Sequence, residues 1–271
     1  MECFSYQGAQ KKLSRVLCDT LPDYSYDYFR KLIRKGDVKI NGKRTKEDIV
    51  LLPGDDVVVY CKEREFIPDV LYEDDNIFAL NKFTGISSEK FAEKVNRIFP
   101  GSVLCHRLDT NTSGILLFAK NERIFELIKT VFANKLIEKH YLAEVWGNFP
   151  PYAEYSDFLE KDEKNGVVRI FTENAKNRSS VITKCTRIKC EGGVSVLDVE
   201  PVTGRTHQIR AHLAFHGYPI LGDGKYGDVD VNKRFHTHIQ HLTAYKIIFH
   251  CASVADLSYL DGLKIELQLN K

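Results

Sequence analysis

Two polar segments of this 271-residue chain combine residue types that do chemistry. The first, residues 105–114, places one acid, Asp109, directly ahead of four hydroxyl and amide side chains and of an apolar stretch at 115–119. A carboxylate fixed by hydroxyls and backbone N–H groups can serve as a nucleophile or as a base. An aspartate at such a place can equally be a turn cap, and spacing alone leaves both roles open.

The second polar segment, residues 202–217, carries two arginines and three histidines. A helix predicted to begin near Thr206 puts His207 and Arg210 on one side, and Arg205 on the turn before it. Cationic side chains grouped in this way can hold an acid or a phosphate group.

A zinc site is not expected in that segment. His207, His212 and His216 do not converge on a helix, and no acid completes a ligand set. We predict that the chain binds no metal, and that the histidines at 236, 238 and 241 are polar loop surface.

A third segment, residues 138–147, contains Tyr141 at the start of an apolar strand. A half-buried strand tyrosine is the commoner outcome for such a residue, and the pattern by itself leaves its role open.

These three segments lie in a region where strands prevail. The pattern predicts strands at 77–81, 115–119, 141–145, 167–171, 180–188, 194–199, 242–249 and 263–269, and helices at 89–98, 121–134 and from about 206. Strands outnumber helices and come in consecutive runs. We therefore expect an α+β domain with a mixed or antiparallel sheet, flanked by helices and loops and spanning residues 72–271.

The first 63 residues read as a separate, small α/β unit, joined to the rest by a linker at 64–71. Helices are predicted at 11–21 and from a Ser25 cap to Gly36, followed by a strand at 38–40 and a tight Asn41-Gly42 hairpin turn. The second helix turns nearly all of its charge outward with one sign. That face consists of Arg30, Lys31, Arg34, Lys35 and, beyond the helix, Lys43. It is either a solvated helix surface or, as we favour, a contact for RNA.

Composition limits where the chain can work. No apolar run is long enough to span a membrane, and the first residues lack the pattern of a secretory signal. The seven cysteines are scattered without CxxC spacing, which is typical of reduced thiols. We expect a cytoplasmic protein without a membrane partner. The net charge of +2 does not discriminate between partners.

Four blocks in this order resemble the RluA family of pseudouridine synthases: Lys82-Phe-Thr-Gly85, His106-Arg-Leu-Asp109-x-x-Thr-Ser-Gly114, Lys139-x-Tyr-Leu-Ala143 and Gly204-Arg-Thr-His-Gln-Ile-Arg210-x-His212. Residues 31–43 are similar to the S-four-like RNA-binding domain, as in the large-subunit ribosomal RNA enzymes of that family. One departure is Phe83, where the family usually has proline. It relaxes a turn and removes no reacting group.

The resemblance implies a reaction and roles for residues. Uridine in structured RNA would be converted to pseudouridine by C1′–N1 cleavage, rotation of the base and C1′–C5 attachment, without cofactor or metal. Asp109 would be the catalytic carboxylate, as nucleophile or as base. Arg205 would pair with it and keep it ionised, and Tyr141 would pack on the uracil. Arg107 would fill the space left by the flipped base or anchor a phosphate. His106, Lys139, His207 and Arg210 would contact phosphates or pack locally.

The expected partner is RNA, most simply large-subunit ribosomal RNA, bound by a monomer. Transfer RNA is a second possible substrate. Two other classes of function remain: an RNA-binding or ribosome-assembly protein without activity, and an enzyme that hydrolyses glycosidic bonds. The first would not need a paired acid and a stacking ring, and the second calls for another carboxylic acid.

Overall fold

The computed structural model describes residues 1–21, 24, 26–61 and 66–268. The chain forms two compact units, Met1–Ile67 and Pro68–Lys271, which we describe separately. Part of the predicted linker, residues 62–65, lies outside the described residues. Its last two residues already belong to β7 (Val70–Glu73) of the second unit.

The first unit has two helices and a four-stranded antiparallel sheet. The helices are α1 (Leu13–Thr20) and α2 (Tyr26–Lys35). The sheet order is β1-β6-β3-β4, from β1 (Glu2–Ser5), β6 (Asp56–Val59), β3 (Val38–Ile40) and β4 (Lys43–Thr45), while β2 (Lys11–Lys12) pairs with β5 (Val50–Leu51). Its core lies between both helices and the sheet, and includes Leu17, Phe29 and Val59.

Local signals in this unit are confirmed. Gly36 ends α2 with a φ of 76°, the left-handed conformation expected of a helix C-cap. Asn41 and Gly42 both have positive φ and join β3 to β4, with Ile40 opposite Lys43. The predicted cap of α2, Ser25, lies outside the described residues.

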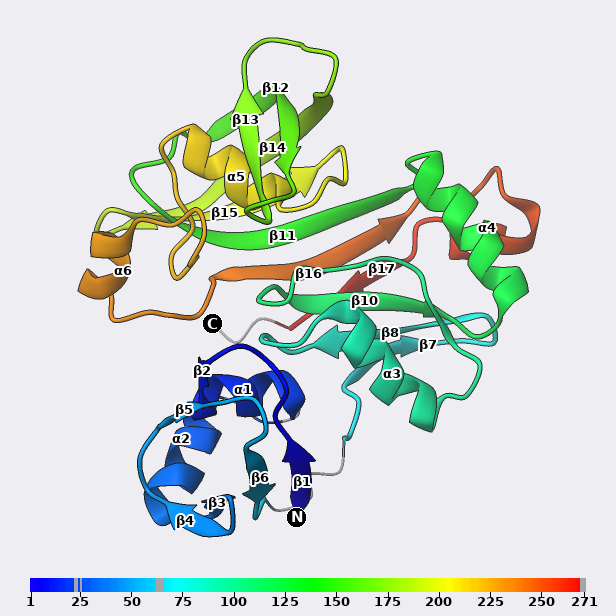
Figure 1. The fold of residues 1–271 in the computed structure, drawn as a ribbon. Coiled ribbons are helices and arrows are strands. Elements are labelled where there is room, and N and C mark those ends of the chain that lie inside the picture. Colours follow the sequence, from blue (N-terminus) through cyan, green and yellow to red (C-terminus); the bar gives the residue numbers. More distant parts are fainter. Residues whose placement is uncertain (22–23, 25, 62–65, 269–271) are drawn as a thin grey trace. The chain divides into compact units, whose positions relative to one another are not determined.

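The second unit is built on one mixed sheet of 11 strands (Figure 1). Its main path is β13-β12-β14-β15-β11-β16-β10-β8-β7, with β17 on β16 and β9 on β10. The β10–β16 pair is parallel and the other pairs are antiparallel. The expected α+β class is therefore confirmed. Besides β7, the strands are β8 (Ile77–Lys82), β9 (Val103–Leu104), β10 (Ser113–Ala119), β11 (Ile137–Trp146), β12 (Tyr152–Asp162), β13 (Val167–Phe171), β14 (Ser179–Glu191), β15 (Val194–Pro201), β16 (Leu242–Phe249) and β17 (Lys264–Glu266).

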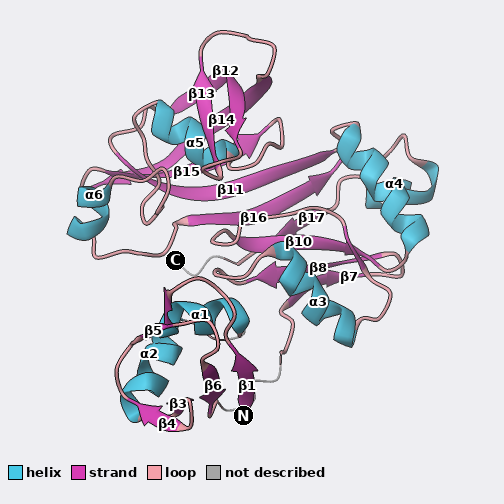
Figure 2. Ribbon diagram, in the orientation of Figure 1, coloured by secondary structure: helices cyan, strands magenta, loops and turns pink. Residues whose placement is uncertain are grey.

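The helices of the second unit pack on different parts of the sheet (Figure 2). They are α3 (Ser88–Ile98), α4 (Glu122–Ala133), α5 (Gln208–Phe215), the short α6 (Val229–Arg234) and a 3-10 turn at Ala255–Leu260. Contacts join α4 to β9 and β10, and α5 to β13, β14 and β15. The described chain contains no helix long and apolar enough to cross a membrane.

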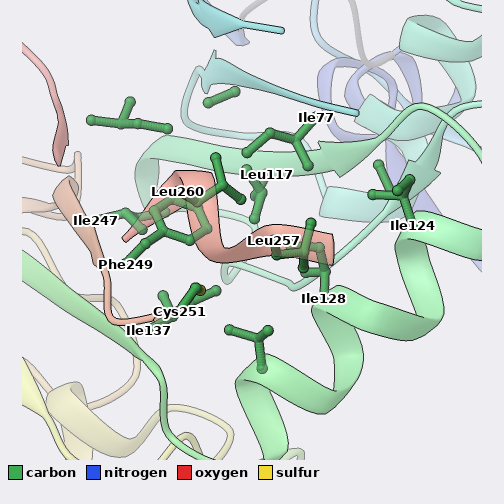
Figure 3. Packing of buried hydrophobic residues seen from close by; sticks show 14 of the residues in the cluster. Ile77, Leu117, Ile124, Ile128, Ile137, Ile247, Phe249, Cys251, Leu257 and Leu260 are labelled. Carbon is green, nitrogen blue, oxygen red and sulfur yellow. The ribbon is translucent and has the colours of Figure 1, made fainter. Parts of the chain in front are cut away.

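A buried hydrophobic cluster fixes the sheet against α4 (Figure 3). Ile124 and Ile128 on α4 belong to one buried cluster with Leu117 on β10, Phe249 on β16 and Leu257 in the 3-10 turn. The Asn121 side chain caps this helix by accepting the Ile124 N–H at 3.0 Å, as predicted. Because β10 follows the Asp109 loop, this core fixes one end of that loop.

The sequence patterns missed or misplaced some elements. They did not predict β12, since most of its side chains are polar and partly or fully exposed. The last predicted strand is shorter than expected, ending at Glu266, and its residue 269 lies outside the described chain. The missed strand matters because it carries Asp157, discussed below.

The central strands bring two site segments together. Ala244 on β16 is opposite Tyr141 on β11 and, on its other side, opposite Gly114 at the start of β10. A Cβ on Gly114 would lie 2.1 Å from the Ala244 carbonyl oxygen, so only glycine fits this crossing. The close approach places the end of the Asp109 loop two strands from Tyr141.

Candidate active site

A pocket in the second unit gathers the three polar segments. Among its walls are Asp109, Lys139, Tyr141, Arg205 and Arg210, together with Arg107, Leu108, Thr112, Pro201, Thr203, Gly204, His207, Gln208, Ile209 and Leu242. Asp109 is the only carboxylate in this lining. The pocket therefore lacks the second carboxylic acid that glycosidases ordinarily use.

The loop that carries Asp109 is anchored through its backbone. The Ser88 hydroxyl donates to the Leu108 carbonyl and accepts the Leu108 N–H, both at 2.9 Å. The Gly85 N–H donates to the Thr110 carbonyl at 2.8 Å. The buried Lys82 ammonium donates to the Thr110 carbonyl at 3.3 Å and also to the carbonyls of Phe83 and Ile86. Burial lowers the pKa of Lys82 to about 8. Asp109 thus sits on a loop held from the neighbouring strand and helix.

The ion pair of Asp109 is made by Arg210. The Nη1 of Arg210 donates to Asp109 Oδ2 at 2.8 Å, and the Arg210 side chain is only 6% exposed. The family resemblance predicted Arg205 in this role, and that prediction is wrong. Arg205 is exposed at the pocket wall, and its backbone N–H donates to Gln208 Oε1 at 3.1 Å. Arg210 is on the first turn of α5, which faces inward, whereas Arg205 precedes the helix.

Arg210 is held by a second carboxylate as well. Its Nε and Nη2 donate to Asp223 at 2.7 and 2.9 Å, and Asp223 is buried. Burial opposes the charge of the guanidinium, but Asp223 first and Asp109 next raise the pKa of Arg210 above its ordinary value. Arg210 is therefore a fixed cation between two carboxylates, where the resemblance implied a phosphate or packing contact.

Tyr141 faces the same pocket from β11 and is 9% exposed. Burial, and secondarily the charge of Asp109, raise the pKa of its hydroxyl above the ordinary range. The hydroxyl therefore stays protonated at neutral pH. The ring offers the pocket an apolar face beside the carboxylate.

The remaining residues expected in the pocket differ in exposure. Arg107 is 75% exposed and pairs with Glu89 at 2.7 Å, so it is free to reorient. Lys139 is partly buried against the Phe132 ring, and burial lowers its pKa. Both line the pocket, and their contact with RNA stays a prediction.

His106 lies behind the pocket. Its Nε2 accepts the Leu117 N–H at 3.1 Å, and the ring packs against Phe132. Burial, followed by the charge of Lys139, lowers the pKa of His106 to about 3. These contacts account for the imidazole as a support of β10 and weigh against a contact with RNA.

The predicted helix starts at Gln208, two residues later than expected, and this changes the place of His207. With a φ of 52°, His207 is in the left-handed region that non-glycine residues rarely occupy. Its Nδ1 contacts the Tyr226 hydroxyl at 2.9 Å, and its Nε2 lies 3.9 Å from Asp109 Oδ2. His207 therefore faces the Asp109 carboxylate.

The prediction that no histidines converge in this segment is partly wrong. His212 and His216 do converge, and an acid joins them: Asp157 Oδ2, from the unpredicted β12, contacts their Nε2 atoms at 2.9 and 2.7 Å. The ligand atoms of these three residues lie within 4.8 Å of one another. His212 Nδ1 also meets the Thr183 hydroxyl at 2.8 Å, so hydrogen bonds within the chain occupy both of its nitrogens. His207 is not part of the group.

In the first unit, the predicted basic face is exposed. Arg30, Lys31, Arg34 and Lys35 all point outward from α2, and Lys43 is exposed on β4. The apolar side of the same helix, with Phe29, Leu32 and Ile33, is buried.

Two site residues were not predicted from the sequence. Asp223 accepts hydrogen bonds from Arg210, and the Tyr226 hydroxyl contacts His207 Nδ1. Both lie in the Gly222-Asp-Gly-Lys-Tyr-Gly227 segment. The three glycines of this segment are typical of a tight turn, but nothing in the spacing connects it to Arg210.

Comparisons with known proteins agree on the family. Residues 78–215 match the family model of RNA pseudouridylate synthases. The chain is 30% identical to the ribosomal large subunit pseudouridine synthase C of Vibrio parahaemolyticus, covering 91% of this chain and 84% of the relative. It is 32% identical to that of Escherichia coli K12, with 83% and 79% covered. A mitochondrial tRNA pseudouridine(32) synthase of Saccharomyces cerevisiae is 31% identical over 82% of this chain and 51% of its own length.

A solved structure shares the fold. Human RNA pseudouridylate synthase domain containing 1 superposes with a TM-score of 0.61 at 24% identity, covering 69% of this chain and 81% of its own. The family model matches half of the chain, and relatives at 30% identity match most of it. This protein therefore belongs to the RluA-type RNA pseudouridylate synthases, enzymes that isomerise uridine in RNA.

Proposed function

We propose that this enzyme converts uridine to pseudouridine in large-subunit ribosomal RNA, with Asp109 as its catalytic carboxylate. The observation that carries the assignment is the Asp109–Arg210 ion pair at 2.8 Å in a pocket that also presents Tyr141. A carboxylate beside C1′ can attack it or stabilise its positive charge while the bond to N1 breaks.

The reaction is an isomerisation, so atoms balance without a co-reactant. The C1′–N1 bond breaks, the uracil rotates, and C5 bonds to C1′. C5 then loses its proton, and N1 gains one. Arg210 orients Asp109 and offsets its negative charge when the substrate excludes water. The protonated Tyr141 hydroxyl and its ring lie where they can stack on the uracil and exchange a proton. We predict that neither metal nor cofactor takes part, so activity should survive dialysis against a chelator.

The exposed cations at the pocket wall are assigned to RNA. Arg107 and Arg205 are solvent-exposed, and Lys139 is close by, so phosphates can reach all three. The target base must leave its stack to enter the pocket. Arg107 can occupy the vacated space by leaving Glu89, or it can anchor the flanking phosphate.

The first unit supports an RNA substrate that is large and structured. Its one-signed basic face on α2 suits an S-four-like RNA-binding domain. The names of the bacterial relatives favour large-subunit ribosomal RNA. The yeast relative, which acts on tRNA by its name, makes tRNA the second candidate. We further propose that the enzyme is monomeric and cytoplasmic. All seven cysteines are free, as in a reducing compartment.

Mapping pseudouridine in total RNA tests the proposal. Cells with the gene, cells without it and deleted cells carrying a restored copy are compared. We expect one or a few large-subunit sites to disappear on deletion and to return on restoration. Loss of pseudouridine at tRNA sites alone would show that the substrate is tRNA and not large-subunit ribosomal RNA. An unchanged map in all RNA classes would overturn the proposed activity.

A further inference from the structure

The turn from Gly222 to Gly227 has a rigid shape. Asp223 Oδ1 accepts the N–H groups of Lys225 and Tyr226 at 2.8 and 3.1 Å. A Cβ on Gly222 would lie 1.8 Å from the Ile239 carbonyl oxygen, and one on Gly227 would lie 2.3 Å from that of Asp223. Glycine is needed at both ends because backbone closes on them. The Asp223 and Tyr226 side chains are therefore fixed relative to each other.

Asp223 determines where the guanidinium of Arg210 points. The Asp223 carboxylate accepts two hydrogen bonds from the Arg210 guanidinium, from Nε at 2.7 Å and from Nη2 at 2.9 Å. A guanidinium is planar, so this two-point contact fixes its plane. The remaining nitrogen, Nη1, is then directed at Asp109 Oδ2, 2.8 Å away. The Asp223 side chain is fully buried, so water does not compete for this contact.

Tyr226 determines the proton position on His207. The Tyr226 oxygen accepts the Val168 N–H at 2.8 Å and lies 2.9 Å from His207 Nδ1. In the described chain the hydroxyl proton has no other acceptor than Nδ1. Burial lowers the pKa of His207, so the ring is neutral near pH 7, and its own proton must then be on Nε2. That N–H faces Asp109 Oδ2 at 3.9 Å, too far for a hydrogen bond and near enough for a reacting atom to contact both groups.

We propose that Asp223 and Tyr226 are positioning residues of the isomerisation. One rigid turn orients Arg210 and His207, the two groups that flank the catalytic carboxylate. Asp223 sets the guanidinium plane, and Tyr226 sets the Nε2–H form of the imidazole. The inference rests on the proposed role of Asp109 and adds two residues that do not touch the substrate.

Single-turnover rates on a uridine-containing transcript, measured from pH 5 to 9, test the proposal. Asp223→Asn keeps an acceptor for the turn and removes the two-point ionic interaction. We expect its rate to fall about 100-fold at every pH, as for a misplaced catalytic group, with RNA affinity within a few-fold of wild type.

Tyr226→Phe removes one oxygen from a partly buried ring and is expected to fold. Without the hydroxyl, His207 Nδ1 is free to take a proton in weak acid. We expect the rate to fall about tenfold at neutral pH, and the acid side of the pH profile to move to higher pH. A loss of folded protein would lower the rate equally at all pH values and leave the profile in place.

Matched controls come from a second turn outside the pocket. Asp74 accepts the N–H groups of Asn76 and Ile77, and it also accepts the Tyr72 hydroxyl. Asp74→Asn and Tyr72→Phe should keep the wild-type rate and profile. Wild-type rates and profiles in both Asp223→Asn and Tyr226→Phe would overturn the inference. If Asp223→Asn does not fold, an unshifted profile in Tyr226→Phe overturns it alone. An inactive wild type would instead count against the proposed function.

Discussion

The two units use positive charge in opposite ways. On α2 of the first unit, the cations are exposed, so each interacts through solvent and can meet a phosphate in many geometries. In the second unit, Arg210 is buried between two carboxylates and has one geometry. Water and salt weaken the first kind of interaction, and burial protects the second. We infer from this difference that the first unit contributes affinity for RNA and the pocket contributes orientation.

The largest effect should come from the buried cation. Arg210→Ala leaves two carboxylates without their partner, which costs about 3–5 kcal/mol when burial is deep. We expect a single-turnover rate about 1,000-fold below wild type and a lowered denaturant midpoint. Arg205→Ala is the matched control: we expect wild-type stability and a loss of about tenfold or less. Equal losses of rate and stability in both variants would remove the contrast between a buried and an exposed arginine.

A second effect concerns pH and the buried His106. Its pKa is lowered to about 3, so an unfolded chain binds a proton below about pH 6.5 that the folded chain excludes. The neutral, buried His106 therefore contributes its full stability above about pH 6.5, and this contribution is lost as the pH falls from about 6.5 toward 3. His106→Gln keeps an acceptor and does not titrate, so between pH 7 and 5 wild type should lose up to about 2 kcal/mol more than the variant. Denaturant unfolding at both pH values measures this. The exposed His238→Gln should follow wild type, and a His106→Gln curve that also follows it would contradict the burial argument.

The smallest effect should come from the exposed cations. Replacing Lys31 and Arg34 by Gln should weaken RNA binding several-fold and reduce the slope of log affinity against log salt by about 0.7–0.9 for each phosphate that is no longer neutralised. The rate at saturating RNA should stay at the wild-type level. Arg123 and Lys129, exposed on α4, provide a double replacement with the same change of charge. If both double variants have the same salt slope, the α2 face has no special part in binding.

The same contrast explains what the sequence could predict. The exposed face of α2, the Gly36 cap and the Asn41-Gly42 turn depend on residues within a few positions of one another, and the structure confirms them. The partner of Asp109 depends on the direction in which α5 begins. His207 adopts a left-handed conformation there, which shifts the helix start and turns Arg210 inward.

The partners of Arg210 and His212 could not be predicted from the sequence pattern, because they lie far away along the chain. Asp223 reaches Arg210 across 13 residues, and Asp157 reaches His212 across 55. Neither acid lies in a segment for which the sequence pattern predicted a helix or a strand. The family resemblance predicted which segments meet in the pocket. Local spacing did not predict which side chains pair.

The most direct test of the central claim compares two aspartates. Asp109 lies in the pocket, and Asp157 is a buried acid outside its lining that bonds to His212 and His216. Asp109→Asn and Asp157→Asn make the same near-isosteric change. Single-turnover rates are measured on the folded fraction, with RNA affinity in parallel. We predict no detectable pseudouridine from Asp109→Asn with RNA affinity within a few-fold of wild type, and substantial turnover from folded Asp157→Asn. Appreciable turnover by folded Asp109→Asn would contradict its role as the catalytic carboxylate.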